Sequence, residues 1–246
     1  MRETPPGAPP RGAPFVAGRE HRRPHLGLIR VITLQDEVLL NKHGRIVAGF
    51  LPEWTVSSWC IPDQPRGVHD EATFTAAVPK VVGLATDITN SAGIDVLVVS
   101  CMDDPGVREA REEVSVPVLG AGSATAAVAR ALAGEEVIGG IGISNQIPKG
   151  FEGILTPCFW RNPPGVRNTL DLLTDGGRRA VLKEAEALKL QGARVVVLGC
   201  TGMCTVGLGK EIERRTGMMV VDPLRSVSLL AEAVVERVAG GGGSVG

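Results

Sequence analysis

The chain has 246 residues, a formal net charge of −1 and a hydrophobic content of 43%, enough apolar material for a sizeable buried core. The near-zero charge gives no electrostatic reason to expect a nucleic acid or an anionic membrane as a partner. An aromatic content of 3% without any tyrosine also argues against a base-stacking platform.

The distribution of apolar residues and the cysteine content both predict a protein of a reducing compartment. No apolar run approaches the roughly 18 residues of a membrane-spanning helix, and the first residues are rich in Pro and Arg rather than in a hydrophobic signal core. We therefore expect a cytoplasmic protein. The five cysteines are odd in number, form no C-x-x-C pair and do not cluster with the four histidines, so neither a disulfide scaffold nor a metal site is expected.

Residues 1–24 are rich in Pro, Gly and Arg and predict a disordered extension. Residues 25–120 predict a first β/α lobe. Its expected elements, in chain order, are a strand over 26–32, a helix over 34–43, a strand over 56–61, a helix from Asp70 that Pro79 kinks or restarts, the strand before Cys101, a short helix to Val114 that Asp104 caps, and a strand over 116–119.

Residues 121–222 predict a second lobe that repeats this order. Its expected elements are a strand over 137–143, a helix over 178–191, the strand before Cys200, a helix over 205–216 and a strand over 218–221, with residues 159–161 in a loop. Residues 223–239 predict a last helix whose apolar stripe packs back on the first lobe or against a second copy of the chain in a homo-oligomer. The glycine-rich residues 240–246 predict a flexible tail.

Two stretches organise the chain, residues 93–101 (GIDVLVVSC) and residues 192–200 (GARVVVLGC). Each is a glycine, a run of mostly aliphatic residues and a cysteine, and the two lie 99 positions apart. Valine-rich runs of this length are typical of strands buried on both faces of a parallel sheet. The fold class expected is therefore α/β, with two pseudo-symmetric, Rossmann-like lobes and helices on both faces of each sheet.

Each cysteine lies at the carboxyl end of its strand, the edge where open α/β sheets bind ligands. A helix is expected to begin soon after each one, and its positive end would favour a thiolate. We therefore predict that Cys101 and Cys200 face one active site in the cleft between the lobes. From opposite sides of a ligand, one thiolate can remove a proton from carbon while the other thiol delivers one, which is two-base racemisation.

Such chemistry needs a C–H next to a carbonyl and hydrogen-bond donors for the developing enolate oxygen. The candidate substrate-binding residues are hydroxyl side chains and loop residues close to the ends of the predicted strands: Thr33, Met102, Asp103, Gly122, Ser123, Ser144, Thr201 and Gly202. Arg30 is left open between an internal pair and a ligand contact, and Cys204 between core packing and a resolving thiol.

Three motifs resemble the Asp/Glu/hydantoin racemase superfamily, and in particular its hydantoin racemase-like branch. They are residues 98–106 (VVSCMDDPG), residues 120–122 (GAG) and residues 198–203 (LGCTGM), within a resemblance over residues 26–238. The resemblance implies a two-lobed α/β fold and cofactor-independent racemisation of a small molecule by one cysteine from each lobe, here Cys101 and Cys200. Many hydantoin racemases carry an asparagine-rich loop where this chain has residues 30–34 (RVITL).

The leading hypothesis is a racemase of a 5-substituted hydantoin or a related ureide such as allantoin. An aspartate- or glutamate-type amino-acid racemase and a maleate-type isomerase are the alternatives within the superfamily. The alternative from another class is a two-lobed protein that binds a small ligand without catalysis.

Overall fold

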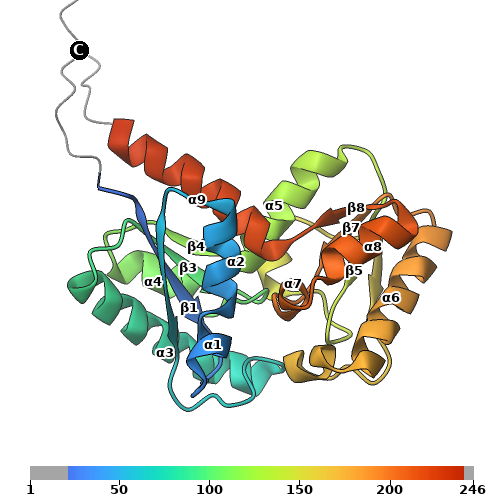
Figure 1. The fold of residues 1–246 in the computed structure, drawn as a ribbon, viewed down its shortest axis with the longest axis horizontal. Coiled ribbons are helices and arrows are strands. Elements are labelled where there is room, and N and C mark those ends of the chain that lie inside the picture. The colour runs from blue at the N-terminus through green and yellow to red at the C-terminus, as the bar shows by residue number, and fades with distance from the viewer. Residues whose placement is uncertain (1–21, 241–246) are drawn as a thin grey trace, which may run out of the picture.

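The chain forms two α/β lobes, described by a computed structural model over residues 22–240 (Figure 1). The strand order is β2-β1-β3-β4 in the first sheet and β6-β5-β7-β8 in the second, and every pair is parallel. The equivalent order confirms the predicted pair of related lobes. The strands are β1 (His25–Arg30), β2 (Thr55–Cys60), β3 (Val96–Ser100), β4 (Val118–Gly120), β5 (Ile138–Ile141), β6 (Phe159–Arg161), β7 (Val195–Leu198) and β8 (Met219–Val221).

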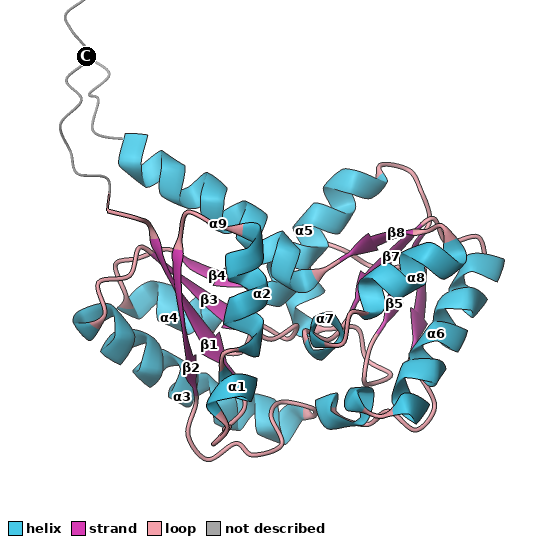
Figure 2. Cartoon of the chain, in the orientation of Figure 1, coloured by secondary structure: helices cyan, strands magenta, loops and turns pink. Residues whose placement is uncertain are grey.

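Helices cover both faces of each sheet (Figure 2). In the first lobe α3 and α4 pack on one face, while α2 and α9 pack on the other. In the second lobe α6 and α8 cover the outer face and α5 covers the face toward the first lobe. The helices are α1 (Glu37–Leu40), α2 (Lys42–Phe50), α3 (Glu71–Ser91), α4 (Val107–Glu113), α5 (Ala121–Ala133), α6 (Asp175–Leu190), α7 (Gly202–Thr205), α8 (Leu208–Thr216) and α9 (Pro223–Gly240), with 3₁₀ turns η1 (Lys149–Phe151) and η2 (Thr169–Leu173).

The expected extension and tail at the two ends of the chain fall almost wholly outside the described residues, which leave out 1–21 and 241–246. Between them, none of the helices from residue 22 to residue 240 is long and apolar enough to cross a membrane.

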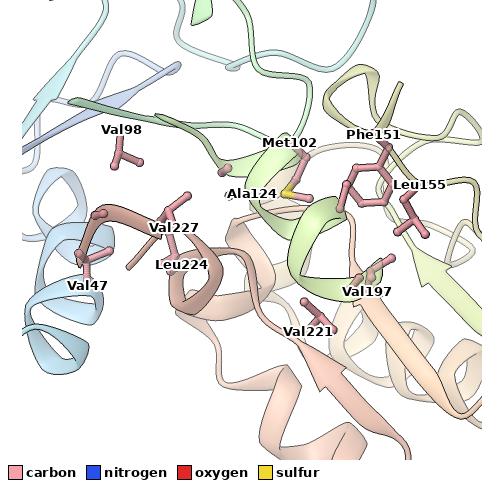
Figure 3. Close-up of a cluster of buried hydrophobic side chains, with 14 of the residues drawn as sticks. Val47, Val98, Met102, Ala124, Phe151, Leu155, Val197, Val221, Leu224 and Val227 are labelled. Atoms are coloured by element: carbon pink, nitrogen blue, oxygen red, sulfur yellow. The ribbon is translucent and has the colours of Figure 1, made fainter. Parts of the chain in front are cut away.

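The lobes share a central core built around α5 and α9 (Figure 3). Val98 of β3 and Val197 of β7 both belong to it, so the inner faces of the two sheets join one hydrophobic cluster. Alternate residues of a strand point to opposite faces, and the neighbouring Val196 accordingly belongs to a separate cluster with α6 and α8. The inward face of α5 is mostly alanine, which lets this helix approach both sheets closely.

Two predicted helices differ from the structure. The expected helix over 34–43 is two helices, because Asp36 caps α1 through the N–H groups of Val38 and Leu39 and α2 follows after Asn41. Of the two alternatives at Pro79, the structure excludes the restart, because α3 continues through this residue. The expected helix over 205–216 is split into α7 and α8 by Gly207, whose φ of +69° lies in the left-handed region.

Residues 159–161, expected in a loop, form the edge strand β6 beside β5, in the place that β2 takes in the first sheet. Trp160 packs against glycines that lie on β5 and just beyond the ends of β5 and β7. A Cβ atom added at Gly140, Gly142 or Gly199 would lie 2.3–2.4 Å from its ring. The bare backbone of these three positions is therefore the surface on which the indole lies.

Candidate active site

Cys101 and Cys200 follow the central strands β3 and β7 and line one cavity between the lobes. Both are almost fully buried, with 8% and 7% of their surface exposed. Of the predicted site residues, those that line this cavity are Cys101, Met102, Asp103, Ser144, Cys200 and Thr201.

Thr33, Gly122, Ser123 and Gly202 do not line the cavity. The Thr33 hydroxyl donates to the carbonyl of Ile61 and accepts from the N–H of Gln64, both at 2.7 Å, so it fixes the loop after β2. Gly202 opens α7, and its N–H points to the Cys200 thiol rather than to open space.

Gly122 and Ser123 donate their backbone hydrogen bonds to Asp104 and do not face the cavity. The Asp104 carboxylate accepts the N–H of Gly122 at 2.7 Å and that of Ser123 at 2.8 Å, so it caps α5. The prediction that Asp104 caps the next helix in the chain is therefore wrong, because α4 begins only at Val107, after Gly106 in the left-handed region. Burial raises the pKa of Asp104 to about 6, against the opposing effect of these hydrogen bonds.

The two thiols lie in unequal surroundings. Burial raises the pKa of Cys101 well above its ordinary value, and the negative charge of Asp103 adds to this. Burial also raises the pKa of Cys200. Several hydrogen bonds oppose it, from Thr169 Oγ1 at 3.6 Å from the sulfur and from the N–H groups of Gly202 and Met203, while the charge of Asp103 has a smaller raising effect here than burial. Both groups thus favour the protonated thiol at neutral pH, and Cys200 is the easier one to ionise.

The expected effect of a helix start acts on Cys200, whose pKa is lowered by the N–H groups of Gly202 and Met203 at the start of α7, but burial outweighs it at both thiols. A helix end contributes roughly 0.3–1 kcal/mol, whereas full burial can shift a pKa by several units. In addition, α7 has only four residues, and α4 begins only at Val107, after the loop that follows Cys101.

A family model described as Asp/Glu/Hydantoin racemase matches residues 43–230, most of the chain. This chain belongs to that family. Its membership confirms the predicted enzyme class, a racemase and hence an isomerase.

Hydantoin racemases are among the relatives of this racemase. The chain is 28% identical over 186 residues to one from Rhizobium meliloti, which covers 70% of this chain and 73% of the relative. It is 26% identical over 163 residues to one from Pseudomonas sp. (strain NS671), which covers 58% of this chain and 59% of the relative.

Solved structures share the fold of this racemase. An allantoin racemase from Klebsiella pneumoniae superposes with a TM-score of 0.71 at 20% identity, over 89% of each chain. A glutamate racemase isoform from Bacillus anthracis gives a TM-score of 0.64 at 15% identity, over 89% of this chain and 84% of that one. These likenesses establish the two-lobed architecture.

His43 and Arg30 of the racemase lie in the cavity beside the thiols, and of these two only Arg30 was a candidate from the sequence. His43 is a lone histidine on the buried face of α2, a pattern that ordinarily indicates core packing. For Arg30 the structure shows internal hydrogen bonds, and the ligand contact stays a prediction. Its guanidinium donates to the carbonyls of Leu39 at 2.8 Å and Leu40 at 3.2 Å, and it lines the cavity.

Lys149 joins the lobes at one side of the cavity. Its ammonium pairs with the Glu71 carboxylate at 2.7 Å and lies 4.1 Å from the centre of the Phe74 ring, both on α3. Its backbone N–H donates to Asp103 at 3.0 Å, so the same residue also holds the loop that follows Cys101.

Trp160 forms part of the second-lobe wall of the racemase cavity. Its indole N–H donates to the carbonyl of Ser144 at 3.0 Å, and its ring meets that of Phe151 edge to face. Within residues 22–240 no group of three or more His, Cys, Asp or Glu side chains could hold a metal ion.

Proposed function

We propose that this racemase inverts the stereocentre of a 5-substituted hydantoin or a related ureide such as allantoin, with Cys101 and Cys200 as its acid/base pair and without a cofactor. The observation that carries the proposal is the position of the two buried thiols, one from each lobe, in the lining of a single cavity. The relatives named hydantoin racemase supply the substrate class.

The mechanism uses the form of the enzyme in which the two sulfurs hold one proton between them, which is the minor form at neutral pH because burial raises the pKa of both thiols. The thiolate removes the proton from the carbon next to the carbonyl, and the opposite thiol delivers its own proton to the other face of that carbon. The product leaves with its stereocentre inverted, and the thiolate and thiol have exchanged places. Hydrogen bonds lower the pKa of Cys200, whereas the Asp103 carboxylate adds to the raised pKa of Cys101. Cys200 is therefore favoured as the thiolate before the first turnover.

The charges of the cavity favour a ring substrate over a free amino acid. A zwitterionic amino acid with a second carboxylate brings two negative groups, which Arg or Lys side chains bind most strongly. Among the described residues that line the cavity, Arg30 is the one with a permanent positive charge, and two backbone carbonyls already take its hydrogen bonds. A hydantoin is neutral and needs donors rather than ion pairs.

The test is polarimetry on enantiopure 5-substituted hydantoins, allantoin, aspartate and glutamate, with deuterium incorporation at the stereocentre followed by NMR in heavy water. We expect one of the ring compounds to lose its rotation and to gain deuterium. Cys101→Ser and Cys200→Ser should each lower the rate at least ~10²-fold, as for loss of a general acid or base. Cys158→Ser is the matched control, because Cys158 is exposed and outside the cavity lining.

Two results would contradict the proposal. Turnover of aspartate or glutamate but of no ring compound would assign the amino-acid alternative. Wild-type rates in both thiol variants would remove the two-thiol mechanism.

A further inference from the structure

His43 brings a buried nitrogen without a partner to the cavity of the two thiols. The residue is 2% exposed and lines the cavity, yet its Nε2 atom has no hydrogen-bond partner among the described residues. A buried polar atom left unpaired costs about 1–3 kcal/mol, which calls for an explanation in a native structure. A polar group of a substrate bound in the cavity would be the missing hydrogen-bond partner of Nε2.

The imidazole is held in a fixed orientation relative to Cys101. Its Nδ1 atom lies 2.8 Å from the hydroxyl of Ser100, the residue that precedes the thiol on β3. Its helix lies close against the first sheet because residue 44 is glycine, where an added Cβ would come within 2.3 Å of the Ser58 hydroxyl. The hydrogen bonds from Arg30 to the carbonyls at the end of α1 hold the chain just before α2.

The surroundings also fix the charge of the ring. Burial lowers the pKa of His43 well below its ordinary value, and the positive charges of Arg30 and Lys42 add to the effect. The ring is therefore neutral, with one nitrogen as donor and the other as acceptor. When the Ser100 hydroxyl donates to Nδ1, the ring proton resides on Nε2, the atom without a partner.

We propose that the Nε2–H of His43 donates a hydrogen bond to the substrate carbonyl oxygen next to the stereocentre and stabilises the negative charge that develops on it. This inference rests on the proposed function. No proton moves to or from the imidazole in the step, since the carbon proton passes to one thiolate and the opposite thiol supplies its replacement. A fixed donor in a buried site stabilises such an oxygen more strongly than water does.

His43→Leu tests the proposal, because leucine removes the donor while keeping an apolar side chain of similar size. We expect kcat to fall by about 10²–10³-fold, the usual loss on removal of one oxyanion donor, with KM changed much less. His43→Gln, which keeps an N–H donor, should recover part of the rate. Ser100→Ala should fall between wild type and His43→Leu, because Ser100 acts only by positioning the ring.

The chain offers a matched control in His25. Its Nε2 lies 2.9 Å from the hydroxyl of Ser57, so it forms another His–Ser pair in the same lobe, between β1 and β2, but it does not line the cavity. His25→Leu should therefore keep the wild-type kcat. Thermal unfolding of all four variants separates a loss of rate from a loss of folding.

A second measurement does not depend on turnover. Nitrogen NMR of the imidazoles, with 5,5-dimethylhydantoin as the probe, should show a neutral His43 ring protonated at Nε2 whose signal shifts on binding while that of His25 does not. The probe has no C–H at the ring carbon and cannot react. A wild-type enzyme that racemises a hydantoin while His43→Leu retains its kcat within threefold would overturn this inference alone. A wild-type enzyme that racemises no ring compound would overturn the proposed function as well.

Discussion

Gly122 is the position where one added methyl group should disturb both the fold and the site. A Cβ atom there would lie 1.9 Å from the carbonyl oxygen of Met102 and 3.0 Å from Cα of Gly150, whereas ordinary contacts begin near 3.4 Å. Both obstacles are backbone atoms, which cannot rotate away as a side chain would. In Gly122→Ala the start of α5 and the loop after Cys101 must therefore move apart by more than an ångström.

The cost follows from overpacking of a rigid region. Such changes cost typically 1–3 kcal/mol, and the backbone on both sides places this one near about 3 kcal/mol. For a chain of this size we expect the melting temperature to fall by roughly 6–12 °C. Because Met102 follows Cys101 directly, kcat/KM should also fall, by up to ~10²-fold for an ångström of misplacement.

Gly83→Ala is the matched control. Gly83 lies inside α3 with nothing within 4 Å of the added Cβ, so alanine should stabilise the helix by about 0.5–1 kcal/mol. Differential scanning calorimetry and a racemisation assay on both variants make the comparison. Gly122→Ala with a wild-type melting temperature and full activity would show that α5 does not abut the Cys101 loop as described.

Three further predictions concern charge and thiol reactivity. With iodoacetamide, read by peptide mass spectrometry, exposed Cys158 should react first at pH 7, and Cys200 should react before Cys101 as the pH rises; the reverse order would contradict the unequal surroundings of the two thiols. The pKa of Asp104 rises from 3.8 to about 6 on folding, so the folded protein binds the extra proton between these values, and the free energy of unfolding should fall by up to ~3 kcal/mol as the pH is raised from 4 to 6. Urea unfolding of Asp104→Asn should not show this dependence on pH. Lys149→Met should change the free energy of unfolding by less than ~1 kcal/mol, since its ion pair is largely exposed, and a larger loss in urea would mean that the contact between the lobes matters more than its exposure suggests.

The repeated sheet could be predicted from the sequence because its information is local. The valine runs of β3 and β7 are buried on both faces, and such strands are apolar along their whole length. The edge strand β6 could not be predicted in this way. It has three residues, and its Trp160 is accommodated by glycines on β5 and beyond β7, at positions that the local pattern around residue 160 does not reveal.

Of the candidate site, the sequence could predict the residues that directly follow the central strands, and not those that packing brings to the cavity. Cys101 and Cys200 follow the carboxyl ends of β3 and β7, the edge at which parallel sheets bind ligands, and the two edges face one cavity. Asp104 was assigned to the wrong helix because capping rules use sequence neighbours, while its real partners lie 18 and 19 residues further on. His43 was missed because only the packing of α2 on the sheet brings it to the thiols.

The unequal thiols carry a kinetic consequence for a racemase. The equilibrium constant between enantiomers is one, so kcat/KM must be equal in the two directions whatever the enzyme prefers. If Cys200 is the thiolate more often, the enzyme form that accepts one enantiomer is the more populated form, and that enantiomer should have the lower KM. Its kcat must then be lower by the same factor. Measured from both enantiomers, kcat and KM should therefore differ in the same direction. Asp103→Asn removes a negative charge that raises the pKa of both thiols but ranks higher among the causes for Cys101, so it should reduce both differences together. Equal KM values for the two enantiomers of the wild-type enzyme would contradict an unequal distribution of the thiolate between Cys200 and Cys101.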